Sequence, residues 1–260
     1  ISFRGKKHVG LVRECLSSSP FSDRAIAIEK PYGGVTFPQA FTELLEWTAD
    51  RTFSSQPTVL KSWLRHLTKT PPPSSFIFPS PERSGLQAYW QTHPSRLLIE
   101  HAKHLSTSRR VLIVTPWIAR ARFFQQELPH SHILHSDLTD KEAFYQWTQF
   151  LSKGVGILIT TKIGAWLSSC VSQVLLDEPE QDDHKQDELT PRYDARKLVL
   201  YSAQRGHTYL ESFGLTPPLH AQIKAPDVSS AVKIFIHHPQ GRSPIPLIQS
   251  DALEALIEEN

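Results

Sequence analysis

Short apolar segments alternate with helical segments through most of this chain. Three of the apolar segments, at 111–115, 155–160 and 174–176, are rich in Val, Ile and Leu. This alternation predicts βαβ units, in which helices cover a parallel sheet on both faces. The predicted strands are Phe76 to Phe78, Val111 to Thr115, His132 to Leu134, Val155 to Thr160, Val174 to Leu176 and Val232 to Ile236. The predicted helices are Pro94 to Leu105, Ala119 to Leu128, one capped by Thr139 with Glu142, and Asp194 to Gln204.

The first 70 residues are organised differently. Residues 1–12 predict two short strands around a glycine turn with a basic tip. Two helices are expected next, one opened by Thr36 with Gln39 in a capping-box spacing and one from near Pro57 to Leu67. This part therefore has the pattern of a small α+β domain.

A proline-rich segment separates the two patterns. Residues 70–75 read Thr-Pro-Pro-Pro-Ser-Ser, a composition typical of a linker. We therefore predict a first domain at 1–70, a linker at 71–81 and an α/β domain at 82–260.

Charge and cysteine content narrow the function classes. Residues 1–70 carry ten Lys and Arg against six Asp and Glu, whereas residues 177–260 carry eight against fourteen. A basic N-terminal part favours an anionic partner such as nucleic acid.

The two cysteines lie far apart and form neither a disulfide nor a zinc pattern, which favours a reducing, cytoplasmic setting. No segment has the length and apolarity of a membrane span. The chain begins at Ile1 and has no methionine, so we expect an internal piece of a longer protein.

Paired carboxylates follow the apolar strand at 174–176. Nucleotide-driven motors hold magnesium and orient the attacking water with acidic residues at such a strand end. If this chain were such a motor, Asp177 would hold the magnesium ion and Glu178 would orient the water. Ligands of open parallel sheets lie at the carboxyl ends of the strands. Thr115 and Thr160 end two other predicted strands, so we expect them at the same edge as the acids.

The phosphate loop that such a motor needs is missing. It should provide consecutive backbone amides, a lysine and a Ser or Thr for magnesium. The segment expected to hold it, residues 79–90, has two prolines, one glycine and no lysine. Arg83 and Gly85 are the candidate phosphate-binding residues there, but an arginine does not restore the amide cradle. The sequence therefore argues against tight binding of ATP and of a magnesium ion on Asp177.

Several motifs follow one order along the chain. They are Val111 to Pro116, Leu134 to Asp140, Thr160 to Ala165, Asp177-Glu178, Lys185-Gln186, Arg192 to Arg196, and Gly214 to Pro218. This series resembles primosomal protein N′, the PriA-type replication-restart helicases. The segment Phe3 to Val12 is similar to the basic hairpin of that family's domain for DNA 3′ ends, and Leu44 to Asp50 is similar to the helix that closes it.

The resemblance implies a fold and a set of site residues. The α/β domain is expected to be a RecA-like helicase lobe 1, preceded by the C-terminal part of a 3′-end DNA-binding domain. Asp177 and Glu178 become vestigial Walker B acids. The residues expected to contact DNA are Arg4, Lys6, Lys7 and Arg24 near the 3′ end, and Lys185, Arg192, Tyr193 and Arg196 along a single strand.

Departures from the family pattern favour a pseudo-helicase. Pro179 and Glu180 replace the Glu and His of the family's acidic motif, and the second lobe with its zinc-binding cysteines does not occur in these 260 residues. The leading hypothesis is a DNA-binding replication-restart protein that acts on forked, 3′-ended or single-stranded DNA, with primosome or replisome proteins as partners.

Two alternatives remain from the sequence. The first is an active ATP-dependent helicase with an unconventional phosphate site around Arg83 to Gln87. The second is a non-catalytic replisome scaffold that docks its partners through the acidic loop 177–188 or through the Trp-bearing helix faces.

Overall fold

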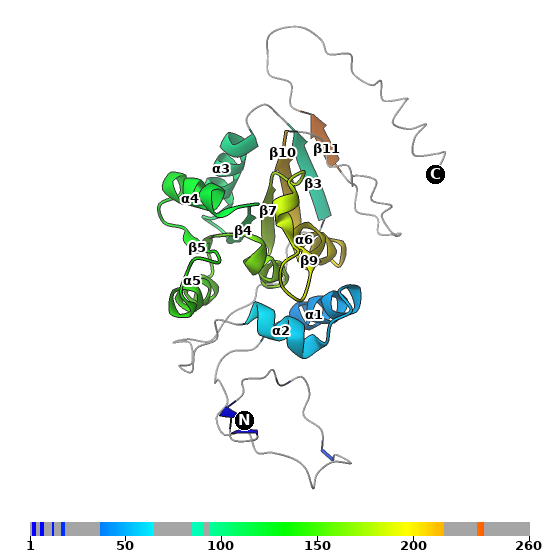
Figure 1. The fold of residues 1–260 in the computed structure, drawn as a ribbon. Helices are drawn as coiled ribbons and strands as arrows, with labels where there is room; N and C mark the ends of the chain where they lie inside the picture. The colour runs from blue at the N-terminus through cyan, green and yellow to red at the C-terminus, as the bar shows by residue number, and fades with distance from the viewer. Residues whose placement is uncertain are drawn as a thin grey trace, which may run out of the picture.

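A seven-stranded parallel sheet forms the centre of the part of the chain that the structure describes (Figure 1). The computed structural model describes residues 2–3, 6–7, 12, 17–18, 37–64, 85–90, 94–215 and 233–236. The strand order is β11-β3-β10-β7-β4-β6-β5, and every neighbouring pair is parallel. The strands are β3 (Gly85–Trp90), β4 (Arg110–Val114), β5 (His132–Leu134), β6 (Gly156–Thr160), β7 (Gln173–Asp177), β10 (Tyr209–Gly214) and β11 (Lys233–Ile236).

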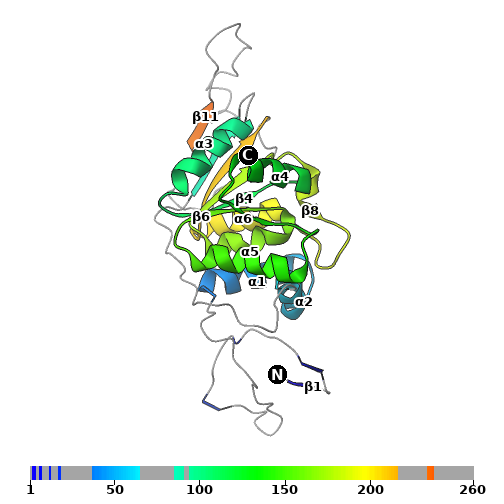
Figure 2. The same ribbon diagram turned by 90° about the vertical axis from the view of Figure 1, so that its left-hand side faces the viewer.

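Helices cover both faces of this sheet because alternate strand residues point in opposite directions. Val111 and Ile113 of β4 pack with helices α3 and α4, whereas Leu112 and Val114 pack with α5, α6 and the 3₁₀ helix η2. Figure 2 shows the helices layered around the sheet. Their bounds are α3 (Pro94–Leu105), α4 (Ile118–Glu127), α5 (Asp140–Ser152), η2 (Lys162–Cys170) and α6 (Ala195–Gln204). The predicted α/β fold with helices on both faces is confirmed.

The two N-terminal helices pack onto one of these layers. Helices α1 (Gln39–Arg51) and α2 (Gln56–Trp63) contact η2, and α1 also contacts α6. Trp166 of η2 is at the centre of the contact, with ring centroids 5.6 Å from Phe41, 6.4 Å from Trp63 and 5.8 Å from Trp147. Both helices therefore share one hydrophobic core with the sheet. The predicted linker, 71–81, lies outside the described residues.

Most predicted elements occur close to their expected bounds. The capping box at the start of α5 is present, with Thr139 and Glu142 each bonding the other's backbone N–H. The expected N-terminal hairpin is present as β1 (Ser2–Phe3) paired antiparallel with β2 (Lys6–Lys7). The predicted helix start at Thr36 is wrong, because α1 begins at Gln39 after Pro38, which makes no side-chain cap hydrogen bond.

The start of the sheet also differs from the prediction. The segment 76–78, expected to be its first strand, lies outside the described residues. Residues 85–90, expected to belong to a loop, form strand β3 instead and pair with β10 and β11. Strand β10 itself was not predicted. Among the described residues, no helix has the length and apolarity needed to cross a membrane.

We predict that Trp166→Ala lowers the free energy of unfolding by about 3–5 kcal/mol, the usual cost of removing a buried aromatic side chain. Trp166 is 1% exposed and contacts both the N-terminal helices and α5. Urea unfolding followed by circular dichroism measures the loss. Tyr145→Ala, at a position that is 58% exposed, is the control and should change stability by less than about 0.5 kcal/mol. Equal effects of the two substitutions would contradict the central role of Trp166.

Candidate functional site

The candidate site lies at the carboxyl edge of the parallel sheet. Strand β7 ends at Asp177, and the neighbouring strand β4 ends at Val114 and is followed by Thr115. Because the two strands are parallel, their ends meet at one edge, where ligands of open α/β sheets bind. Helix α4 begins just beyond β4, with Arg120 in its first turn.

Asp177 is fully buried, and both of its carboxylate oxygens accept hydrogen bonds. Thr115 donates its hydroxyl to Oδ2 at 3.0 Å. Arg120 donates Nε to Oδ2 at 2.7 Å and Nη2 to Oδ1 at 2.8 Å. This is a bidentate arginine–carboxylate pair, the strongest geometry for such an interaction.

Arg120 also contacts other groups around the acid. Its Nη2 lies 3.1 Å from Oε1 of Glu178 and donates to Oγ of Ser95 at 2.8 Å. Its guanidinium carbon lies 5.1 Å from the ring centroid of Phe124, within cation–π range. Arg120 thereby connects β7, the start of α3 and its own helix α4.

The electrostatics of the site keep the guanidinium of Arg120 positively charged. Burial raises the pKa of Asp177, while Arg120 and Thr115 oppose that shift. Burial and the nearby charge of Asp177 raise the pKa of Glu178. Burial lowers the pKa of Arg120, but the surrounding carboxylates raise it by more, so that its net pKa shift is upward. The guanidinium is therefore the counter-ion of the acid pair.

The donor set does not fit magnesium in this arrangement. Magnesium in proteins is held by one or two carboxylates and keeps several waters in octahedral geometry. Asp177 is fully buried, and three hydrogen bonds from Arg120 and Thr115 use most of the lone pairs of its carboxylate. A metal ion would have to displace the guanidinium. Among the described residues, no group of three or more His, Cys, Asp or Glu side chains is arranged to hold a metal ion.

His184 holds the backbone at the end of strand β7 through hydrogen bonds to its carbonyl groups. It lies in the short 3₁₀ helix η3 (Asp182–His184) and is fully buried. Its Nε2 is 2.9 Å from the carbonyl oxygen of Asp177 and 3.2 Å from that of Glu178, so Nε2 carries the proton and donates. Burial lowers the pKa of His184 to about 4. Glu178 has φ +46°, in the left-handed region that a non-glycine residue rarely adopts, and His184 holds the carbonyl there.

Arg196 fixes the loop that follows the acids. Its guanidinium donates to Asp194 at 2.7–3.1 Å, to the carbonyl of Pro179 at 2.9 Å and to that of Gln181 at 3.1 Å. Only 13% of its side chain is exposed. Arg196 thus stabilises the loop from inside.

The other residues predicted to contact a single strand have different surroundings. Tyr193 is 8% exposed, and its hydroxyl donates to the carbonyl of Lys162 at 3.2 Å. Lys185, with 41% of its side chain exposed, pairs with Asp182 at 2.7 Å, and Arg192 is exposed. Lys185 and Arg192 are therefore the accessible cations of this group, and their contact with DNA stays a prediction.

Of the remaining predicted site residues, the structure describes Lys6, Lys7 and Gly85. Arg4, Arg24 and Arg83 lie outside the described residues, whereas Lys6 and Lys7 form strand β2. Gly85 begins strand β3, beside Tyr209 at the start of β10, and so lies at the amino edge, opposite to the acids. Its expected role in a phosphate loop does not agree with this position.

Sequence reasoning missed Arg120, Ser95 and His184. A signal for Arg120 was present, because a cation in the first turn of a helix opposes the helix dipole and needs a compensating anion. The predicted helix at 119–128 follows a strand that ends at the same edge as Asp177. No comparable sequence signal marks Ser95 or His184.

We predict that Arg120→Gln lowers the free energy of unfolding by about 3–5 kcal/mol at neutral pH, because it leaves a buried carboxylate unpaired. The folded pKa of Asp177 already lies above its unfolded value, so the folded state holds the proton to higher pH. The contribution of Asp177 to stability therefore falls as pH rises between the two values. Removal of the Arg120 guanidinium raises the folded-state pKa of Asp177 further, so the pH range over which stability falls extends to higher pH.

The loss from Arg120→Gln should accordingly be smaller near about pH 4, close to the unfolded pKa of Asp, than at neutral pH. Urea unfolding over a pH series measures it. Arg122→Gln, at a pair with Asp137 that is more than half exposed, is the matched control and should cost about 0–1 kcal/mol. Adding Asp177→Asn should recover part of the loss, and a double variant without any recovery would rule out the unpaired carboxylate as its cause.

We predict that His184→Gln removes an acid-sensitive part of the stability. The folded pKa of about 4 lies below the unfolded value of about 6.5, so the unfolded state takes up the proton first and stability falls as pH falls through that range. Between pH 7 and 5 this residue should cost the wild type about 2 kcal/mol. The variant should lack that loss, whereas His130→Gln, at an exposed position, should retain it. Parallel pH profiles for wild type and His184→Gln would overturn this assignment.

No known protein-family model matches the chain. Over 123 residues it is 28% identical to the replication restart protein PriA of Haemophilus influenzae, a stretch that covers 45% of this chain and 17% of that protein. The chain therefore spans less than a fifth of the length of that relative. Among solved structures, it is similar to the C-terminal domain of the DEAD-box protein Dbp5, with a TM-score of 0.40 and 18% identity over 68% of this chain and 97% of that chain. Part of the chain is thus similar to a replication restart protein of the type that its motifs resemble.

Proposed function

We propose that this chain is a PriA-like DNA-binding protein of replication restart whose helicase-type domain does not hydrolyse ATP. The observation that carries the proposal is the use of Asp177, whose two carboxylate oxygens accept hydrogen bonds from Arg120 and Thr115. In a motor, the acid at this strand end holds magnesium. Here an internal guanidinium neutralises it instead.

The connection between β3 and α3 supports the same proposal. In an open α/β nucleotide-binding sheet, a glycine-rich turn between a strand and a helix wraps the phosphates. Only residues 91–93 separate Trp90, the end of β3, from Pro94, the start of α3. Their sequence, Gln-Thr-His, contains neither glycine nor lysine. In this proposal the domain keeps a RecA-like architecture as a support and binds neither ATP nor magnesium.

The proposed partner is forked or 3′-ended DNA, as the motif resemblance and the similarity to PriA suggest. Lys6 and Lys7 of the N-terminal hairpin, with Arg4 and Arg24, would bind phosphates near a 3′ end. Lys185 and Arg192 would contact the single strand, while Tyr193 and Arg196 hold the loop that presents them. The proposed setting is cytoplasmic, with primosome proteins as further partners.

We expect forked DNA to bind more tightly than a blunt duplex of equal charge, and Lys6→Glu with Lys7→Glu to abolish this preference. Each lost phosphate contact also lowers the salt dependence of binding. Fluorescence anisotropy at several salt concentrations measures both quantities. The charge-matched control is Lys103→Glu with Lys141→Glu, at exposed positions on α3 and α5. An unchanged fork preference in the Lys6 and Lys7 variant, or equal binding of fork and blunt duplex, would contradict DNA recognition.

The nucleotide part of the proposal has its own measurement. Equilibrium dialysis of the wild type with radiolabelled ATP and magnesium should detect no binding in the micromolar range. Micromolar binding that disappears in Asp177→Asn would instead favour an active motor. DNA recognition and the absence of ATP binding are thus tested separately, because a result that contradicts one does not contradict the other.

A further inference from the structure

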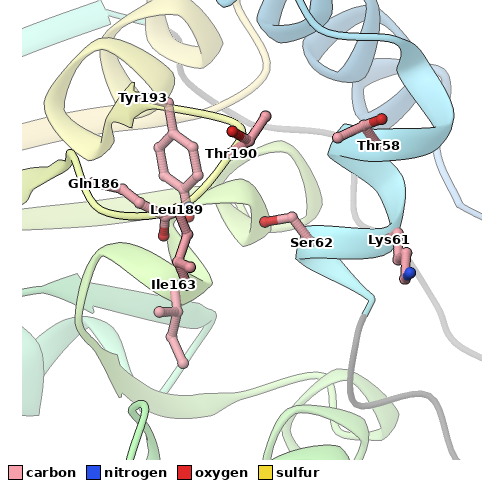
Figure 3. A pocket seen from close by; sticks show the side chains of 8 residues that line it. All are labelled: Thr58, Lys61, Ser62, Ile163, Gln186, Leu189, Thr190 and Tyr193. Carbon is pink, nitrogen blue, oxygen red and sulfur yellow. The ribbon is translucent and has the colours of Figure 1, made fainter.

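A cavity of about 330 Å³ lies between helix α2 and the loop that follows the acid pair. Thr58, Lys61 and Ser62 line it from α2, and Ile163 lines it from η2. The opposite wall comes from the loop, with Gln186, Leu189, Thr190 and Tyr193 (Figure 3). This cavity is separate from the Asp177–Arg120 pair.

Apolar surface and available polar groups meet in this cavity. Leu189 is 59% exposed, and it lies with Ile163 and Tyr193 on one side of the cavity. Across from them, Lys61 and Ser62 form no hydrogen bond or ion pair within the described part of the chain. Pockets that bind small ligands combine an apolar lining with a few polar groups of this kind.

The chemistry of the lining matches one nucleotide. The apolar wall offers contact to the flat face of a base. The side-chain amide of Gln186 donates one N–H to the carbonyl of Pro191 at 3.0 Å, which leaves its oxygen and its second N–H for a base edge. Lys61, at the end of α2, can neutralise the attached phosphate, and the hydroxyl of Ser62 can donate to it. The volume is near the lower end of the range of about 300–1,000 Å³ typical of ligand pockets, so it suits one nucleotide rather than two.

The charges on the loop distinguish this cavity from a general polyanion surface. Lys185 and Arg192 are at least partly exposed on the loop, but so are Asp187 and Glu188 between them. This mixed charge gives little attraction for the dense phosphates of a duplex. A base that leaves the stack and enters the cavity would add apolar and hydrogen-bonding contacts that a paired base cannot make.

We propose that the cavity between α2 and loop 186–193 binds one unstacked nucleotide of single-stranded DNA, with the base on Ile163, Leu189 and Tyr193 and the phosphate on Lys61. This inference rests on the proposed DNA-binding function and names a contact within it. It assigns a role to the loop that lies between His184 and Arg196, the two residues that hold the backbone after the acid pair. The segment from Gln186 to Tyr193 is then one wall of a nucleic-acid site.

The test uses the whole chain and a fluorescent twelve-nucleotide oligo-dT. Ser62→Phe fills the cavity and should weaken binding at least about fivefold, because each base stacked on protein contributes about 1–3 kcal/mol. Ser136→Phe, at an exposed position away from the cavity, is the control and should bind as the wild type does. Lys61→Glu should also lower the salt slope of the binding constant by about 0.7, the value for one phosphate of a single strand. Lys103→Glu should leave the slope unchanged.

A second measurement locates the base directly. Oligo-dT with one 5-iododeoxyuridine, irradiated in the complex, should cross-link to the peptide that contains Tyr193. Equal binding by Ser62→Phe and Ser136→Phe, or a cross-link elsewhere, would overturn the proposal. So would equally effective competition by a twelve-residue poly-glutamate, because it would show an anion site without base recognition. Retained fork binding through Lys6 and Lys7 in Ser62→Phe would leave the proposed function intact even then.

Discussion

The buried ion pair between Asp177 and Arg120 determines how the carboxyl edge of the sheet is built. A fully buried carboxylate needs a compensating charge and hydrogen bonds for its lone pairs. Arg120 supplies the charge and Thr115 the additional donor, at 2.7–3.0 Å. Since these residues come from β7, α4 and the end of β4, the pair fixes the start of α4 against two strands. Ser95 extends the same network to α3.

Much of the fold followed from the sequence because strand and helix periods were strong. The alternating residues of β4, such as Leu112 and Ile113, face different helix layers, as a strand covered on both sides requires. Strand β3 could not be predicted from its sequence, because residues 85–90 follow Pro79 and Pro81 and have no run of β-branched residues. Packing by α6 and pairing with β10 and β11 made these residues a strand, and no local pattern contains that information.

The candidate site could be predicted only in part, for a similar reason. Strand ends follow from apolar runs, so Thr115 and Asp177 were expected at one edge. The contact with Arg120 depends on where α4 lies after its turn, and that position is set by the packing of Phe124 and Ala121 under the sheet. Likewise, the role of Arg196 depends on a loop that returns to place it beside the carbonyl of Pro179. Long-range packing of this kind is not visible in a short motif.

An acid pair at a strand end is therefore weak evidence for catalysis when an arginine of the same chain neutralises it. Removal of Arg120 would leave Asp177 buried without its counter-charge, so stability alone constrains Arg120 to stay. His184 and Arg196 add a constraint of the same kind, because they hold the backbone of residues 177–181 through its carbonyl groups. The motif in which motors hold magnesium can thus persist as a structural element. His184 and Arg196 also flank residues 186–193, so the contacts that hold the acid pair fix both ends of the segment that lines the cavity.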